Sequence, residues 1–174
     1  MQGAPGVRKL ALTVHVIASV GWFGAAAAFL ALAIAGLGSQ STDRVQALYL
    51  AMKLVCFFVI IPLSLASFVS GLVCALSSPW GLFEHYWVVF KLGLNLAATT
   101  VLLLYSQSLG YLADLARNGN LTSADVAQLR DPTHLVHSVG ALIILTLTTI
   151  LAVYKPRGKT RYGRRKTLTR AGSG

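Results

Sequence analysis

Four long apolar stretches constrain this chain more than any other feature of its sequence. They cover residues 9–37, 46–77, 83–112 and 132–154. The hydrocarbon core of a bilayer is about 30 Å thick and is crossed by about 20 apolar residues in a helix. None of the stretches alternates as a strand does, and a helix satisfies its own backbone groups in lipid. The sequence therefore predicts an all-α, polytopic membrane protein, with a four-helix transmembrane bundle in residues 1–154 and a basic cytoplasmic tail in residues 155–174.

The composition excludes the common alternatives to a membrane protein. Charged residues make up 11% of the chain and apolar residues 55%, whereas soluble domains carry about 25% charged residues. Two cysteines among 174 residues do not make a disulfide scaffold. The first apolar stretch is about twice as long as the core of a cleaved signal peptide, so we expect a retained helix.

The basic residues are distributed unevenly between the two ends of the predicted helices. Arg8 and Lys9 precede the first stretch, and eight basic residues follow the fourth, namely Lys155, Arg157, Lys159, Arg161, Arg164, Arg165, Lys166 and Arg170. The opposite side holds only Arg44, Arg117 and Arg130. Because basic flanks remain in the cytoplasm, we expect both termini there. The density of charge in the tail favours anionic lipid as a partner and not nucleic acid.

Polar side chains fall on one face of each predicted helix. The third helix is the most regular: Glu84, Lys91, Asn95, Thr99 and Ser106 lie within an arc of about 80°. Polar groups that face lipid are costly. We therefore expect Lys91, Asn95 and Thr99 to face the interior of the bundle.

Three residues on these faces are candidates for cofactor binding. His15 lies six residues beyond Lys9, about 9 Å into the helix, and Lys91 lies at a similar depth on the third helix. Histidine is a common ligand of haem iron. Trp22 shares the face of His15 and would wall a flat cofactor, and Lys91 would pair with a carboxylate. In the alternative interpretation, His15 is a hydrogen-bonded core residue and Lys91 extends to the headgroups.

His134 and His137 form a second candidate site, for a metal ion. Their spacing places both rings on one face of the fourth helix. Structural metal sites commonly use four ligands, so the pair also fits a purely interfacial role. The sequence holds no motif of a soluble enzyme and gives no catalytic residue, which favours a protein that is not an enzyme.

Two segments of the sequence resemble small bacterial membrane families. His15, followed seven residues later by the Trp-Phe-Gly that begins at Trp22, looks like their first helix. Residues 80–87, together with Lys91, look especially like a four-helix integral membrane family of unknown function. The chain is more distantly similar to the membrane region of copper-resistance protein D and to the HemJ-type protoporphyrinogen oxidase family. The resemblance extends over all four predicted helices, although its motifs are short and degenerate.

The resemblance implies a protein of the bacterial inner membrane, with haem b as the candidate cofactor. HemJ-type proteins bind haem b, and their first-helix histidine corresponds to His15. After Gly24, however, those proteins have Pro-Arg and a second histidine, where this chain reads Ala-Ala-Ala-Ala-Phe-Leu. This difference argues against porphyrinogen oxidation. The family of unknown function implies no activity.

Three classes of function remain open at this point. The first is a membrane protein that binds haem b or a metal inside the bundle. The second is an accessory subunit whose helices pack against a membrane partner or another copy of the chain. The third is a small transporter component, for which four helices are few unless the protein forms oligomers.

Overall fold

The computed structural model describes residues 5–78, 80–117 and 121–171, so the ends of the predicted ranges 1–154 and 155–174 lie outside the described residues. The elements are α1 (Pro5–Leu37), α2 (Thr42–Val55), the π-helical turn η1 (Cys56–Ile60), α3 (Ile61–Ser77), α4 (Tyr86–Arg117), α5 (Ser123–Leu129), α6 (Thr133–Tyr154) and α7 (Arg161–Ala171). Among these residues, four helical spans are long and apolar enough to cross a membrane. The prediction of an all-α protein with four membrane-spanning helices is therefore confirmed.

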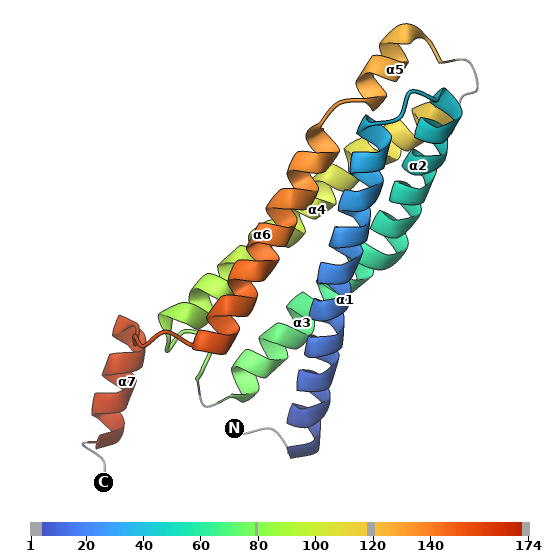
Figure 1. Cartoon of the computed structure of the whole chain (residues 1–174). Helices are drawn as coiled ribbons and strands as arrows, with labels where there is room; N and C mark the ends of the chain where they lie inside the picture. The colour runs from blue at the N-terminus through green and yellow to red at the C-terminus, as the bar shows by residue number, and fades with distance from the viewer. Residues whose placement is uncertain (1–4, 79, 118–120, 172–174) are drawn as a thin grey trace.

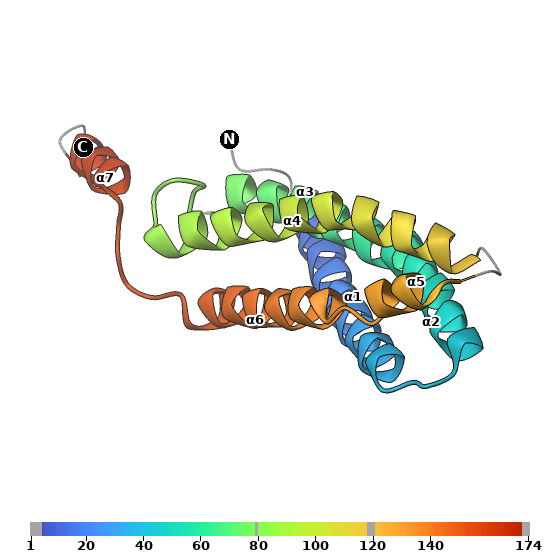
Figure 2. The same cartoon turned by 90° about the horizontal axis from the view of Figure 1, so that it is seen from above.

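The long helices run up and down in one bundle (Figure 1). Helix α1 packs against α3 and α6, and α4 packs against α2 and α6. Helix α1 begins and α6 ends at the same end of the bundle, which we call the terminal end, and α7 lies there too (Figures 1 and 2). Helix α5 lies at the opposite end, the α5 end.

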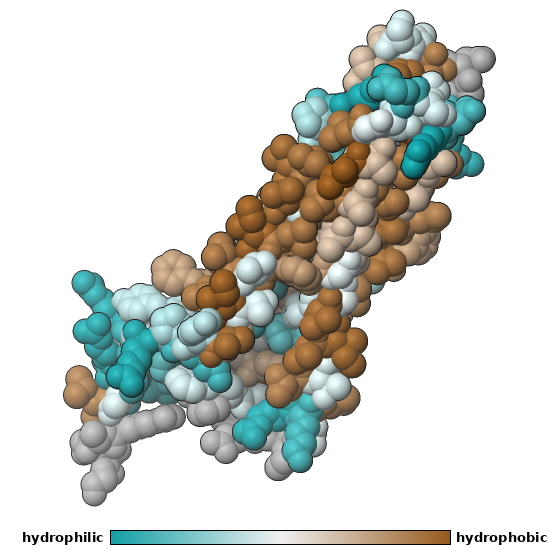
Figure 3. Space-filling model, viewed as in Figure 1, coloured by the Kyte–Doolittle hydropathy of each residue, from teal (hydrophilic) through white to brown (hydrophobic). Residues whose placement is uncertain are grey.

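The surface pattern fits a bilayer. Figure 3 shows apolar residues along the middle of the visible face and polar residues at both ends. Large apolar side chains such as Phe58 and Val20 are 75% and 67% exposed, which would be costly in water. The interior of the bundle holds Trp22 and Phe29 among small residues such as Ala26 and Ala98. Small side chains let membrane helices approach closely.

The second span is not a regular α-helix throughout. In η1 the amide of Ile61 donates to the carbonyl of Cys56, one residue further back than in an α-helix. This turn ends two residues before Pro62, which has no N–H to donate and would clash in a regular helix interior. With the turn in place, Cys56, Ile60 and Ser64 are all buried against the other helices.

The third helix begins later than predicted, at Tyr86 and not at residue 83, and ends at Arg117. Residues 83–85 are held by the C-terminal tail: the Thr160 hydroxyl donates to the Phe83 carbonyl at 2.5 Å, and the Thr160 amide donates to the Glu84 carbonyl at 3.0 Å. These contacts hold residues 82–84 as bends and His85 in an isolated bridge with Lys159, so the helix starts only at Tyr86. The prediction that Glu84 belongs to the polar face of the third helix is therefore wrong, because α4 begins only at Tyr86. The tail also contains a helix, α7, that the sequence did not predict.

Candidate functional site

His15 is fixed on α1 by a hydrogen bond to the backbone of α3. Its Nδ1 lies 3.0 Å from the Ser67 carbonyl oxygen and 3.2 Å from the Ser70 hydroxyl. A carbonyl oxygen only accepts hydrogen bonds, so Nδ1 carries the proton and donates it to Ser67. In the neutral ring, Nε2 is then an acceptor with its lone pair directed away from α3.

Lys91 of α4 meets that free nitrogen. Its Nζ lies 3.4 Å from His15 Nε2, across 76 residues of sequence. The ammonium has only donors, so it donates to the Nε2 lone pair. The expectation of matching depth for the two residues is confirmed, and the structure brings them into contact.

Gly71 makes room for the imidazole. A Cβ atom at this position would lie 2.9 Å from His15 Cε1 and 3.3 Å from Nδ1. Both separations are shorter than ordinary van der Waals contacts. The ring of His15 therefore occupies the space that a side chain on α3 would need.

Two adjoining cavities meet at this histidine and together form what we call the His15 cleft. Their volumes are about 460 and 530 Å³, within the range of ligand pockets, and both are lined by His15, Ser67, Lys91 and Asn95. The first cavity extends to the terminal end, where Arg8, Lys155, Trp80 and Trp87 line it. The second extends between α1 and α6 along apolar side chains that include Val20, Phe23, Leu145 and Val153.

The His15 cleft is electropositive. Arg8, Lys91 and Lys155 line it, and none of the described residues along either cavity is acidic. A low-dielectric pocket with fixed cations strengthens the attraction of an anion. The cleft is therefore suited to a ligand with an apolar body and one or more negative groups.

Two buried polar atoms at the cleft have no hydrogen-bond partner in the described part of the chain. They are Nε1 of Trp87, a donor, and Oδ1 of Asn95, an acceptor. Asn95 is 8% exposed and Thr99, one turn further on α4, is 6% exposed, which confirms that this polar face points inward. Buried polar groups in native proteins are nearly always paired with protein, water or a ligand. Both atoms thus add capacity for binding a polar ligand group.

Trp22 does not line the His15 cleft. It is 2% exposed and borders a separate apolar cavity of about 250 Å³ nearer the α5 end, together with Phe29 and Tyr105. His15 and Trp22 share a face of α1, but seven residues separate them by about 10 Å along the helix axis. Between them the hydroxyls of Ser19 and Ser67 form a hydrogen bond of 2.8 Å that joins α1 to α3.

His134 is held between two tyrosines. The Tyr49 hydroxyl donates to the Leu129 carbonyl at 2.8 Å and, having used its hydrogen, accepts from His134 Nε2 at 2.6 Å. The Tyr105 hydroxyl hydrogen-bonds His134 Nδ1. This arrangement assigns each hydrogen once and leaves the imidazole neutral. No pattern in the sequence indicated this network, because its three side chains come from three different helices.

His137 lies beside that network without joining it. Its ring stacks on Tyr105 with 4.3 Å between ring centroids, and its Nδ1 donates to the Thr133 carbonyl at 2.8 Å. A metal ion at His134 would have to displace a tyrosine hydroxyl. Among the described residues, no group of three or more His, Cys, Asp or Glu side chains comes together to hold a metal ion.

Comparison with known protein families, curated proteins and solved structures finds no match to this chain. The resemblances carried by the short motifs therefore stay predictions, and the case for function depends on the geometry of the His15 cleft.

Proposed function

We propose that this chain is a multi-pass protein of the bacterial inner membrane, with both termini in the cytoplasm, and that it binds haem b in the His15 cleft. One observation carries the proposal: His15 directs an unprotonated Nε2 into the cleft while its Nδ1–H is held by the Ser67 carbonyl. Histidines that ligate metals typically donate their other ring N–H to a carbonyl or carboxylate, which fixes the tautomer and the ring orientation.

The rest of the cleft fits the chemistry of the porphyrin. Haem b combines an apolar macrocycle with two carboxylates. The second cavity of the cleft, between α1 and α6, would hold the macrocycle. Arg8, Lys91 and Lys155 would hold the carboxylates. Lys91 now occupies the ligand side of His15, so haem binding would exchange that contact for a carboxylate. Haem would supply one-electron chemistry when bound, and His15 would hold its iron through Nε2.

The test is a haem titration of the full chain in detergent, followed by the Soret band. We expect saturation at one haem per chain. His15→Ala should abolish the saturable component. His137→Ala, a matched loss of a half-buried imidazole outside the cleft, should leave it unchanged. Lys91→Gln should weaken binding about tenfold, because a hydrogen bond to a charged group contributes about 1.5 kcal/mol or more.

Two outcomes would contradict the proposal. One is a difference spectrum that is the same for the wild type and His15→Ala, which would indicate adsorption of haem to the apolar surface. The other is purified protein that takes up no haem at all. The second outcome would favour the accessory-subunit interpretation, which native mass spectrometry can examine by detecting a bound partner or a second copy.

A further inference from the structure

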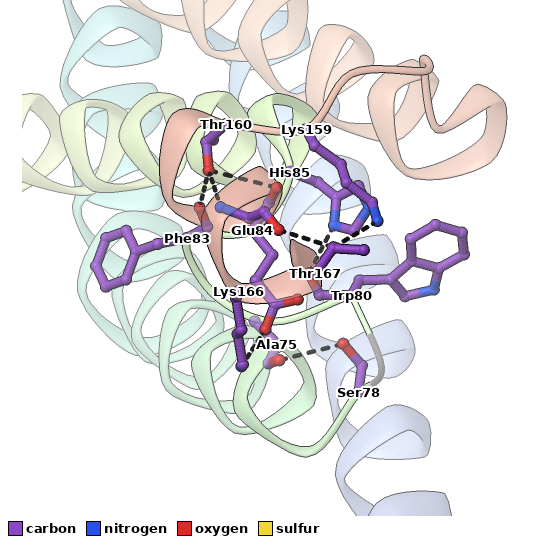
Figure 4. Close-up of polar contacts among 11 residues, drawn as sticks. Ala75, Ser78, Trp80, Phe83, Glu84, His85, Lys159, Thr160, Lys166 and Thr167 are labelled. Atoms are coloured by element: carbon purple, nitrogen blue, oxygen red, sulfur yellow. Dashed lines mark hydrogen bonds and ion pairs between the residues drawn. The ribbon is translucent and has the colours of Figure 1, made fainter. Parts of the chain in front are cut away.

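Helix α7 is docked on the bundle and is not a loose tail. Figure 4 shows Thr160, just before α7, directed at the backbone of Phe83 and Glu84 in the segment between α3 and α4. The Glu84 carboxylate also pairs with Lys166 of α7. Contacts to the backbone and to a side chain thus hold the start of α7 in one place at the terminal end.

Gly163 makes this docking possible. A Cβ atom at position 163 would lie 3.0 Å from both the carbonyl carbon and the Cα of Glu84, and closer still to the carbonyl oxygen. These are backbone atoms, which cannot rotate out of the way as a side chain could. A side chain at this position would therefore separate α7 from the segment between α3 and α4.

The docked helix presents a basic surface. Arg161, Arg164 and Arg165 are exposed, and the α7 sequence contains no acidic residue. Tyr162 and Leu168 are 60% and 74% exposed on the same short helix. The exposed surface of α7 thus combines three cations with two apolar side chains.

We propose that α7 is a fixed platform for the headgroups of anionic phospholipids, and that its docking, as well as its charge, sets the affinity. Three observations support this partner. The charge is complementary, α7 lies at the terminal end of the membrane-spanning helices, and its exposed apolar side chains suit the headgroup boundary. A cation held in place before binding loses less conformational entropy than one on a flexible tail. This proposal does not depend on haem.

The first experiment tests how much the charge of α7 contributes to lipid binding. Affinity of the full-length protein in detergent for phosphatidylglycerol and for phosphatidylcholine is compared by native mass spectrometry. Arg161→Gln combined with Arg164→Gln should weaken phosphatidylglycerol binding about 25-fold, about fivefold for each cation near an anionic surface. The matched control is Arg44→Gln combined with Arg117→Gln, which removes two cations at the α5 end and should have little effect.

The second experiment tests how much the docking of α7 contributes to lipid binding while its charge stays the same. Gly163→Val should weaken phosphatidylglycerol binding about tenfold, since three arginines would become mobile and each would then lose side-chain entropy on binding. Gly93→Val, at a site where a Cβ meets nothing within 4 Å, is the matched control. Unchanged affinity in Gly163→Val would show that a loose basic tail suffices. Equal binding of the two lipids by the wild type, or no effect of the arginine substitutions, would overturn the platform itself.

Discussion

Gly71→Ala tests the packing of the candidate site with a change of one methyl group. The new Cβ would lie 2.9 Å from His15 Cε1. The imidazole cannot retreat freely, because its Nδ1–H is bonded to the Ser67 carbonyl at 3.0 Å and its Nε2 faces Lys91. We therefore expect the added methyl group to push the ring away from α3 and to weaken its hydrogen bond to the Ser67 carbonyl.

The expected cost comes from two opposing effects. Alanine stabilises a helix interior by about 0.5–1 kcal/mol relative to glycine. Overpacking of a filled site costs about 1–3 kcal/mol. Gly93→Ala on α4 supplies the matched control, because a Cβ there meets nothing within 4 Å, so only the first effect applies. The free energy of unfolding of Gly71→Ala should consequently fall about 1–3 kcal/mol below that of Gly93→Ala.

Equilibrium unfolding in mixed micelles, followed by circular dichroism, measures this difference. The same two proteins should also differ in haem binding, with affinity lost in Gly71→Ala and kept in Gly93→Ala. Equal unfolding free energies for the two variants would refute the close packing of His15 on Gly71. A destabilised Gly71→Ala that binds haem normally would refute the role of the His15 orientation.

Three further predictions follow from other contacts. Tyr105→Phe removes the donor to His134 Nδ1 and should lower the unfolding free energy by about 1–3 kcal/mol, the cost of an unsatisfied buried acceptor, as measured by the same unfolding assay. Asp114→Asn breaks the 2.6 Å ion pair with Lys53, but the Asp114 side chain is 61% exposed, so the loss should stay below about 1 kcal/mol; a larger loss would mean that the pair is shielded from solvent. Topology reporters fused to the C-terminus and inserted between α4 and α5 should report opposite sides of the membrane, and a periplasmic signal from the C-terminus would contradict the charge-based orientation.

The membrane-spanning elements could be predicted from the sequence because they depend on local properties. Length and apolarity identify the four spans, and the 3.6-residue period identifies the inward face of α4 with Asn95 and Thr99. The short helix α5 is equally local: Thr122 and Asp125 form a capping box at its start. Such features need no knowledge of which helices are neighbours.

Helix α7 could not be predicted in this way. Its segment, Arg161–Ala171, is rich in like charges and has no apolar stripe, so neither hydropathy nor period marks it as a packed element. The pairing of Lys166 with Glu84 joins residues 82 positions apart. In the sequence, Gly163 indicates only a weak helix former. Its role in docking is evident only from the tertiary structure, in which the backbone of Glu84 lies against it.

Only part of the candidate site could be predicted from the sequence. The sequence placed His15 and Lys91 at similar depths on inward faces, but it also grouped His15 with Trp22, and the tertiary structure separates that pair into two cavities. It gave no indication that His134 lies between two tyrosines. These contacts depend on which helices are neighbours and on how each is rotated and shifted along its axis. In a membrane, lipid is as apolar as the bundle interior, so hydropathy does not specify those settings, and only helix–helix packing and hydrogen bonding decide them.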